Sequence, residues 1–543
     1  MTKKVIIPSA LLIHHELQLE FGKISSAMIP LNGKPILDLI SKKYIENEYD
    51  VIVIGNRDDD QLRSYVANKE RFSYVPISNT KSLKDTINQA LIYVGYPDVL
   101  AINFADTYID WRFFDDELDD TLFFKNQSDV FRWTTFQMKE GRLISIEEKN
   151  NEKVLQKSNV FVGAFIIKKA ERFHELLRSA NDDLSYDGFY DAIMNYFNES
   201  NFKSLVEPDW LDFGHIDTYY KAKREIGINQ REFNSISIDT KRAILTKKSK
   251  DEEKFINEIK WYRKLPKEFK YLTPRIFEYS TKEDPILKQE YYSYPVLMDL
   301  YLYADLGPSV WMNIFESLKE IHDDLSSYSD GCNLTKIDLE EMYSSKTKNR
   351  LNKILDDVKF SDFKYSLEIN GYECMGIKYI IKELDNVLDR IELYDDVRYG
   401  IIHGDLCLSN ILYEQKNGII KLIDPRGSFG KEGIFGDIRY DEAKLSHSLR
   451  GDYDFILNGL FDVKKKRNSD NGIIINYKTK IEPKHLKIKE IFESIFKSDI
   501  KIKTIESLLF LSMVPLHSDR PESQEIFLSK GIRLFNEVIE ECK

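Results

Sequence analysis

Cysteine is scarce in this chain. Only four occur among 543 residues, and no two of them form a C-x-x-C pair. Their scattering excludes a disulfide framework and a cysteine-based zinc site, so we expect a reducing, cytoplasmic environment. Long apolar runs are missing too, since no stretch approaches the ~20 apolar residues of a membrane span. The N-terminus shows no signal-peptide pattern, and we expect no membrane span.

A surplus of positive charge is also absent. The chain has 78 Lys and Arg against 90 Asp and Glu, for a net charge of -12. General nucleic-acid binding needs a basic face, so we exclude nucleic acid as a partner and expect the Lys-rich segment 464–467 to be a solvated loop. A length of 543 residues exceeds what one hydrophobic core organises, which predicts two or more domains.

One stretch in the C-terminal half, IIHGDLCLSNILYEQKNGIIKLIDPRG, places two acids and an amide at the ends of short apolar runs. Asp405 follows the first run, Asn410 comes five residues later, and Asp424 ends the second run. Hard cations take oxygen ligands, and phosphoryl transfer needs a carboxylate to accept the hydroxyl proton. We therefore predict Asp405 as the catalytic base and Asn410 and Asp424 as Mg²⁺ ligands. The alternative is an ordinary hairpin with acidic turn residues.

This stretch resembles the H-G-D-x-x-x-x-N and I-D motifs of the aminoglycoside phosphotransferase and choline kinase families. The resemblance implies an α+β, bilobal, protein-kinase-like fold that uses ATP and Mg²⁺. It also implies a strand lysine that binds the ATP phosphates and pairs with a helix glutamate. Lys247 or Lys248 is the candidate lysine, with Lys247 preferred, and Glu258 is the candidate partner; alternatively, these are surface charges. Glu290 lies in a segment that resembles the inter-lobe hinge, whose backbone binds adenine.

Residues around this motif are expected to support it. His403 is expected to brace the loop by hydrogen bonds rather than take part in chemistry. The resemblance implies that Asp437 and Asp441, in a G-D-x-x-x-D run, orient the catalytic loop through backbone contacts. Arg426 is a candidate contact for a phosphate or for the acceptor. Residues 515–520 either help to choose the acceptor or form a plain interhelical loop.

The first part of the chain alternates apolar strands with amphipathic helices. Strands are expected over residues 5–7, 50–55, 72–77 and 98–104, and helices over 35–44, 61–69 and 82–93. Such alternation predicts an α/β fold with a parallel, doubly wound sheet covered on both faces. Ligands of such sheets gather at the C-terminal ends of the strands.

Four segments at these positions resemble the nucleotidyltransferases that join a nucleoside triphosphate to a sugar phosphate or another small phosphate. IPLNGKP contains Lys34, which the resemblance makes a phosphate contact. NFAD ends in Asp106 and WLDFG contains Asp212, which correspond to the metal-binding aspartates. IEEK, with Glu148 and Lys149, resembles an acceptor segment. The resemblance implies a GT-A-like fold, with Mg²⁺ and CTP or UTP as co-substrate.

Glycine is missing where these nucleotidyltransferases have most of it. Their first strand leads into a glycine-rich loop whose backbone N–H groups bind the triphosphate. Here Gly22 is the only glycine before Gly33. Lys23 is a candidate to replace the usual basic residue, and His14 and His15 either reach phosphate or are solvated. Nucleotidyl transfer and a degenerate, binding-only domain both remain open.

These observations predict a nucleotidyltransferase-like domain at residues 1–228 and a kinase-like domain at 229–543, with lobes at about 233–295 and 296–543. Together the resemblances imply a bifunctional enzyme. It would phosphorylate a sugar, polyol or amino alcohol with ATP and then couple that phosphate to a nucleoside monophosphate. The product would be an activated precursor of bacterial surface polysaccharide (capsule or lipopolysaccharide).

Two alternatives remain from the sequence. One is an active kinase whose first domain only binds a nucleotide sugar and regulates; the other is a pair of scaffolds in a polysaccharide-assembly complex. The expected partners are nucleotides and a small-molecule acceptor. The oligomeric state, including a homo-oligomer, is left open.

Overall fold

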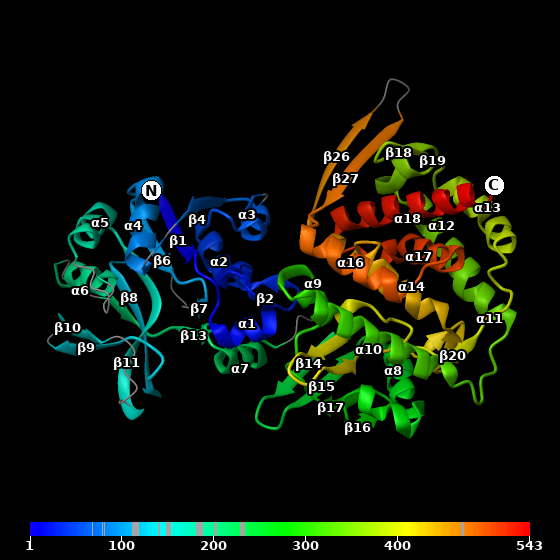
Figure 1. Cartoon of the computed structure of the whole chain (residues 1–543), viewed down its shortest axis with the longest axis horizontal. Helices are drawn as coiled ribbons and strands as arrows, with labels where there is room; N and C mark the ends of the chain where they lie inside the picture. Colours follow the sequence, from blue (N-terminus) through cyan, green and yellow to red (C-terminus); the bar gives the residue numbers. More distant parts are fainter. Residues whose placement is uncertain are drawn as a thin grey trace. The chain divides into compact units, whose positions relative to one another are not determined.

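The computed structural model describes residues 1–67, 69–78, 80, 82–110, 119–139, 142–147, 154–180, 188–199, 204–227, 234–467 and 472–543. The chain divides into two compact units, coloured along the sequence in Figure 1. Unit 1 comprises Met1–Ile226 with Tyr303–Asp305, and unit 2 comprises Gly227–Leu302 with Leu306–Lys543. The predicted domain boundary, between residues 228 and 229, falls in the segment 228–233, which lies outside the described residues.

Unit 1 is built on a mixed sheet with a parallel centre. Its parallel strands lie in the order β6-β1-β4-β5, with bounds β6 Val99–Asn103, β1 Lys3–Ser9, β4 Asp50–Asn56 and β5 Phe72–Ile77. An antiparallel part extends the sheet beyond β6 through β11 Val154–Ile167, β8 Thr121–Asp129, β9 Thr135–Lys139 and β10 Arg142–Glu147. Strand β12 Ser204–Val206 pairs parallel with β8. The strands expected over the first 104 residues are therefore present.

Helices cover both faces of this sheet, as the predicted doubly wound α/β fold requires. Figure 1 shows α4, α5 and α6 on one side of the strands and α2 and α3 on the other. Their bounds are α2 Ile36–Glu46, α3 Asp60–Val66, α4 Leu83–Val94, α5 Ala170–Ser179 and α6 Phe189–Glu199. Alternate strand residues such as Ile6, Ile52 and Ile102 pack in one apolar cluster with α4, α5 and α6. The fold prediction for this part is confirmed.

A short ribbon brings two distant parts of unit 1 together. Strand β7 Thr107–Asp110 pairs antiparallel with β13 Asp209–Asp212, so that Asp212 lies opposite Thr107. Helix α7 Ile216–Ile226 follows β13. Residues that are about a hundred positions apart in sequence therefore meet beside the C-terminal end of β6.

The glycine-poor segment after β1 contains a helix. Residues His15–Phe21 form α1, and Ser26–Met28 form a 3-10 turn. The Ala27 N–H donates to Ser9 Oγ over 2.9 Å, which ties this segment to the end of β1. The apolar residues Leu17 and Phe21, four positions apart, give this helix a buried side.

Unit 2 begins with an antiparallel sheet and one helix. The strand order is β14-β15-β17-β16, with bounds β14 Asn234–Asp239, β15 Ile244–Ser249, β17 Ile286–Glu290 and β16 Ile276–Ser280. Helix α8 Glu252–Lys264 contacts β15. It buries Phe255, Ile259 and Tyr262, the apolar positions on one predicted face.

The remainder of unit 2 is mainly helical. Its helices are α9 Leu297–Tyr303, α10 Pro308–Ser327, α11 Lys336–Glu340, α12 Lys346–Asp356, α13 Ile377–Arg390, α14 Arg439–Leu449, α15 Tyr453–Leu457, α16 Pro483–Ile495, α17 Ile500–Met513 and α18 Pro521–Glu541. Helices α14, α17 and α18 share a large apolar core. A sheet-plus-α8 lobe followed by a helical lobe is the predicted bilobal arrangement, and that prediction is confirmed.

Short strands within the helical lobe flank the motif residues Asp405, Asn410 and Asp424. They are β20 Tyr399–Ile401, β21 Ile411–Glu414, β22 Ile419–Leu422 and β25 Phe435–Asp437. β21 and β22 form a hairpin, and β20 pairs with β25. Asp405 thus follows β20, and Asp424 follows β22.

The Lys-rich segment 464–467 was expected to be a loop, and this expectation is wrong. It belongs to strand β26 Phe461–Arg467, which pairs along its whole length with β27 Ile473–Thr479. Its side chains are exposed, as expected. Among the described residues, no helix combines the length and the apolar character needed to cross a membrane.

The core of unit 1 gives a first testable prediction. Phe165 is fully buried, and its ring centroid lies 5.5 Å from that of Phe173 and 6.1 Å from that of Phe189. Phe165→Ala should lower the free energy of unfolding of unit 1 by roughly 3–5 kcal/mol, because it removes buried apolar atoms and leaves a cavity. Hydrogen exchange of unit 1 peptides during urea titration measures this loss.

The matched control is Tyr93→Ala on α4, where the side chain is 68% exposed. It should change the unfolding free energy by no more than about 0.5 kcal/mol. Equal effects of the two variants would contradict the core described here.

Candidate active sites

A buried lysine joins three elements of unit 2. Lys247, on β15, points its Nζ at Glu258 on α8, with distances of 2.9 Å to Oε1 and 2.8 Å to Oε2. The same Nζ donates to Asp424 Oδ1 over 2.9 Å. Burial opposes the ammonium, but the charges of Asp424 and Glu258 raise the pKa of Lys247, so that it stays protonated. Its neighbour Lys248 points away and pairs with Asp284.

The backbone conformation after β22 aims the Asp424 carboxylate. Asp424 has φ +57°, a left-handed conformation that Asp tolerates better than most residues. Its N–H donates to the hydroxyl of Tyr262 on α8 over 3.1 Å. Further along the loop, a Cβ at Gly427 would lie 2.1 Å from the Asn257 carbonyl oxygen. Only glycine lets this loop approach α8 so closely.

The loop that carries Asp405 is bound by its neighbours. Asp441 on α14 accepts hydrogen bonds from the N–H of His403 (2.6 Å) and of Gly404 (2.9 Å). His403 Nε2 donates to the Ile423 carbonyl over 2.9 Å, which ties this loop to the one that carries Asp424. His403 and Asp441 thus occupy the bracing positions that the sequence suggested.

Asp437, the other acid of that run, behaves differently. Its carboxylate accepts hydrogen bonds from Arg439 Nη2 (2.6 Å) and from the Tyr343 hydroxyl (2.8 Å). The expectation that Asp437 contacts the catalytic loop is therefore wrong in the described residues. The reason is that β25, which carries Asp437, pairs with β20 and turns this side chain toward the base of α14.

Asn410 and Asp424 offer oxygen atoms suited to a hard cation. Asn410 Nδ2 donates to the Asp405 carbonyl (2.9 Å) and to Asp405 Oδ2 (3.1 Å). These bonds orient the amide, and its oxygen accepts no hydrogen bond in the part of the chain that the structure describes. An amide oxygen and the half-exposed carboxylate of Asp424 are ligands that Mg²⁺ prefers, so the residues fit the metal that the motif implies.

In unit 1, two carboxylates converge on a glycine. A Cβ placed on Gly214 would lie 2.9 Å from Asp106 Oδ2 and 3.3 Å from Asp212 Oδ1. Asp212 Oδ2 accepts a hydrogen bond from Thr218 Oγ1 over 2.7 Å, and the Phe213 N–H donates to the Asp106 carbonyl over 2.8 Å. Burial raises the pKa of Asp212, and a nearby cation would stabilise its charged form. This pair fits a divalent metal.

The other predicted site residues of unit 1 are not brought to this pair by any described contact. Lys34, on the two-residue strand β3 Lys34–Pro35, is exposed, with its Nζ 3.9 Å from Asp38 Oδ2. Lys23 is exposed in the turn after α1. Glu148 and Lys149 lie outside the described residues.

Comparison with solved structures finds two kinds of enzyme. HddC from Yersinia pseudotuberculosis is 17% identical, with coverage of 42% of this chain and 100% of its own and a TM-score of 0.33. The inositol-1-phosphate CTP transferase from T. maritima is 12% identical, with coverage of 42% and 98% and a TM-score of 0.33. Aminoglycoside-3'-phosphotransferase of type VIII is 13% identical, with coverage of 55% and 98% and a TM-score of 0.30.

The chain resembles a nucleotidyltransferase joined to a phosphotransferase. After the motifs that each contains, we call unit 1 the nucleotidyltransferase-like unit and unit 2 the kinase-like unit. No family model and no curated protein matches the chain. Because all three TM-scores are below 0.5, the activities are inferred from the side chains of the two sites.

The kinase-like unit contains a site residue that sequence reasoning missed. Lys444 Nζ lies 2.8 Å from Asp405 Oδ1, and its side chain is only 13% exposed. Burial acts against the charged carboxylate, but Lys444, His403 and Arg426 hold the pKa of Asp405 well below its ordinary value. The sequence did contain an indication of this contact. Lys444 follows Asp441 by three residues on α14, so both side chains face the same loop.

A second missed group lies in the nucleotidyltransferase-like unit. Ligand atoms of His14, Glu16 and His215 all lie within 4.8 Å of one another. His215 follows the Asp212–Gly214 turn, so this group is close in sequence to the carboxylate pair. Two imidazoles and a carboxylate suit a borderline metal such as Zn²⁺ better than Mg²⁺. The sequence offered His14 as a phosphate contact or as a solvated residue, and here it lies directly before α1.

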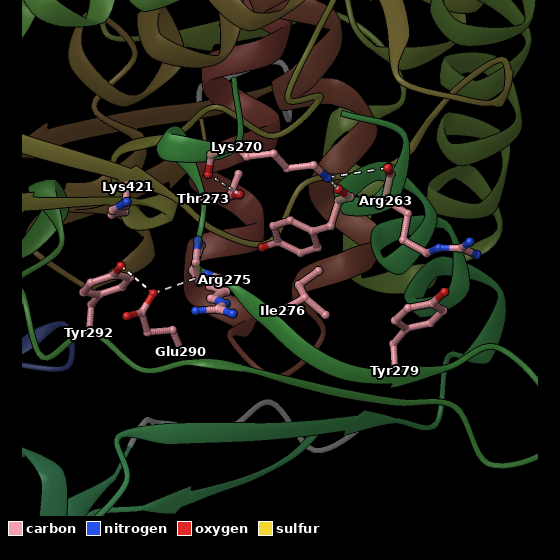
Figure 2. A pocket seen from close by; sticks show the side chains of 11 residues that line it. Arg263, Lys270, Thr273, Arg275, Ile276, Tyr279, Glu290, Tyr292 and Lys421 are labelled. Atoms are coloured by element: carbon pink, nitrogen blue, oxygen red, sulfur yellow. Dashed lines mark hydrogen bonds between the residues drawn. The ribbon is translucent and has the colours of Figure 1, made fainter. Parts of the chain in front are cut away.

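The cavity in Figure 2 belongs to the kinase-like unit, and Glu290 and Tyr292 of the predicted hinge segment line it. It has a volume of about 550 Å³, and its lining includes four cations: Arg263, Lys270, Arg275 and Lys421. Glu290 points into it and accepts a hydrogen bond from the Tyr292 hydroxyl over 2.7 Å. The backbone N–H of Glu290 donates to the Arg275 carbonyl. Adenine would therefore have to bind backbone groups of residues that follow Glu290. Neither Lys247 nor Asp424 lines this cavity.

The buried ion pair yields a second prediction. Lys247→Met should weaken binding of Mg²⁺–ATP at least tenfold, because it removes the cation that faces Asp424. It should also lower the unfolding free energy of the kinase-like unit by roughly 3–5 kcal/mol, because Glu258 is left buried without its partner. Isothermal titration with ATP and urea unfolding measure the two effects.

The control, Lys248→Met, changes the same residue type at the next position of β15. Its side chain is 44% exposed, so both quantities should stay close to wild type. In the double variant Lys247→Met/Glu258→Gln, stability should recover while ATP binding remains weak. Similar losses in the two single variants would contradict the assignment of Lys247.

The carboxylate pair yields a third prediction. Gly214→Ala should weaken Mn²⁺ binding by the nucleotidyltransferase-like unit roughly tenfold, because the new methyl group displaces Asp106 Oδ2 and Asp212 Oδ1. Stability should change little, because Asp106 can rotate away. Titration is done in an Asp424→Asn/His14→Ala background to remove the two other candidate metal sites, with Gly307→Ala as control, since nothing lies within 4 Å of its added Cβ. Unchanged Mn²⁺ affinity in Gly214→Ala would rule out a metal between these carboxylates.

Proposed function

We propose that this chain is a bifunctional enzyme. The kinase-like unit transfers a phosphoryl group from ATP to a hydroxyl of a small metabolite. The nucleotidyltransferase-like unit then couples that phosphate to a nucleoside monophosphate taken from CTP or UTP. The observation that carries the proposal is the presence of a separate carboxylate centre in each unit, one at Asp405 and Asp424 and one at Asp106 and Asp212.

The first reaction uses residues that the structure brings together. Asp405 accepts the proton of the acceptor hydroxyl, whose oxygen forms a bond to the γ-phosphorus of ATP. The bond between that phosphorus and the β,γ-bridging oxygen breaks, and ADP leaves. Lys247 binds the α- and β-phosphates, held in place by Glu258. Magnesium bound by Asp424 and Asn410 would offset the charge that builds up on the phosphates.

The second reaction forms a different phosphorus–oxygen bond. An oxygen of the acceptor phosphate bonds to the α-phosphorus of the nucleotide, and the bond to the α,β-bridging oxygen breaks, which releases pyrophosphate. Asp106 and Asp212 would hold a divalent metal that stabilises the charge developing there. Lys34 and Lys23 are proposed phosphate contacts, and Glu148 and Lys149 are proposed contacts of the acceptor.

A sugar, polyol or amino alcohol is the proposed acceptor class, and the nucleotide-linked product would feed bacterial capsule or lipopolysaccharide synthesis in the cytoplasm. The combination of a phosphoryl transfer and a nucleotidyl transfer in one chain supports this biosynthetic role. An activated building block is what a kinase followed by a nucleotidyltransferase produces.

A second candidate function is favoured by the segment after β1. A glycine-rich loop would present backbone N–H groups to a triphosphate, whereas here helix α1 occupies this segment. In this alternative the first unit binds a nucleotide sugar and regulates, and only the kinase-like unit is catalytic.

Substitution of one aspartate in each unit separates these functions and gives a fourth prediction. Asp405→Asn should lower the kinase kcat by about 10²–10⁴-fold, the range of a lost general base, while pyrophosphate release from a supplied phosphorylated acceptor persists. Asp106→Asn should abolish pyrophosphate release and leave ADP formation intact. Coupled assays for ADP and pyrophosphate read the two reactions in the same samples.

The outcomes are distinct. Wild-type ADP formation without pyrophosphate release, for every nucleoside triphosphate and phosphorylated acceptor tested, would favour the regulatory alternative. Loss of both activities in either single variant would contradict two independent centres. Absence of both activities in the wild type would favour the alternative in which both units are scaffolds in a polysaccharide-assembly complex.

A further inference from the structure

We propose that the acceptor of the kinase-like unit carries a negative charge: it is a hydroxyl compound that also bears a carboxylate or phosphate group. The inference rests on the proposed kinase function and narrows its substrate class. It comes from a group of four cations around Asp405 and Tyr440, namely Lys346, Arg350, Arg426 and Lys444, which we call the cation cluster.

Two members of the cation cluster come from α12. Lys346 and Arg350 are four residues apart, so they lie on the same face of the helix. Lys346 Nζ lies 5.8 Å from the centroid of the Tyr440 ring, and Arg350 Nη1 donates to the Ser512 carbonyl over 2.8 Å. A π-helical turn, Glu341–Ser345, directly precedes them. Such turns are frequent at functional sites, because they re-aim the residues that follow.

The other two members come from the catalytic elements. Arg426 follows the Asp424 loop, and its Nη1 donates to the Tyr440 hydroxyl over 2.9 Å. Lys444 on α14 forms the ion pair with Asp405. Lys444 thus contacts the carboxylate that accepts the hydroxyl proton, while Arg426 and Lys346 meet at Tyr440.

The positive charges of the cation cluster outnumber the carboxylates that pair with them. Lys444 pairs with Asp405, but no carboxylate in the described part of the chain lies within ion-pair distance of Lys346, Arg350 or Arg426. Burial and the charges of Arg426, Arg350 and Lys444 depress the pKa of Lys346 well below its ordinary value. Cations placed together without counter-charges repel each other, and an anionic ligand would offset that repulsion.

The nucleotide does not account for this charge. Lys247 already faces Asp424 and Glu258, and its electrostatic partners are these two acids. The groups that act on Lys346 are Asp405 and the other members of the cation cluster. The contacts of Lys247 thus include no member of the cation cluster, and we assign Asp424 to the ATP side and Asp405, which Lys444 contacts, to the acceptor side.

An acceptor hydroxyl must come within hydrogen-bond reach of Asp405 to lose its proton there. The rest of a small acceptor then lies among the members of the cation cluster. A carboxylate or phosphate on that acceptor would form charge-assisted hydrogen bonds, with the Arg350 and Arg426 guanidinium groups suited to bidentate contact. A cationic amino alcohol would meet like charges, which disfavours that class.

Matched acceptors test the proposal with the full-length protein. ADP formation is measured with two series built on constant scaffolds: glycerol, D-glycerate, glycerol 3-phosphate and 3-amino-1,2-propanediol; and glucose, gluconate, glucose 6-phosphate and glucosamine. We expect kcat/KM to be at least tenfold higher for the anionic members than for the neutral and cationic members of the same series. Comparison of carboxylate with phosphate members identifies the anionic group.

A faster neutral or cationic member, with slower anionic ones, would overturn the inference and leave the kinase function standing. No ADP above the acceptor-free level from any member would overturn the kinase function, and the inference with it.

Variants on α12 provide the second test. Lys346→Gln and Arg350→Gln should each raise the KM of the preferred anionic acceptor at least tenfold, with the KM of ATP unchanged within about twofold. The control is Lys353→Gln, an exposed lysine on the same helix, which should match the wild type. A rise in the KM of ATP in the first two variants would assign these cations to the nucleotide and overturn the proposal.

Discussion

The ion pairs of Lys247 hold the kinase-like site together. One ammonium group binds Glu258 on α8 and Asp424 after β22, so that β15, α8 and the loop that carries Asp424 share a single charged centre. Such a buried group is stable only when its partners are in place, because desolvation of an unpaired charge costs several kcal/mol. Tyr262 and Gly427 add to the same junction, the first by a hydrogen bond to the Asp424 backbone and the second by allowing close contact with α8.

Both units position acidic groups in a similar physical way, although their folds differ. A short strand or hairpin ends, a turn follows, and a residue from elsewhere in the chain holds the acidic turn. Asp441 does this for the Asp405 loop through two backbone N–H groups. Thr218 does it for Asp212 through a side-chain hydrogen bond. In each case a hydrogen bond fixes either the backbone or the side chain of the acidic residue, which restricts where its carboxylate oxygens can meet a ligand.

The neighbouring charges of the two centres set them apart. Asp405 lies among cations, which keep it ionised and leave an excess of positive charge on the acceptor side. Asp212 is half-buried, with hydroxyl, amide, indole and histidine groups acting against the rise of its pKa. The first environment suits proton acceptance beside an anionic ligand, and the second suits a bound divalent cation.

The order of apolar and polar residues along the chain determined much of the fold and the candidate motif of this protein. Strand and helix periods over the first 104 residues specify the α/β sheet, because each element must bury one face. The spacing of Asp405, Asn410 and Asp424 specifies a candidate phosphoryl-transfer motif, because a tight loop and two short strands hold these residues at fixed offsets. The tertiary structure alone decided which of Lys247 and Lys248 is buried, that α1 replaces a glycine-rich loop, and that Lys444 meets Asp405. It also brought Lys346 beside Tyr440. These contacts join residues from distant elements, and their partners depend on helix packing that no local pattern records.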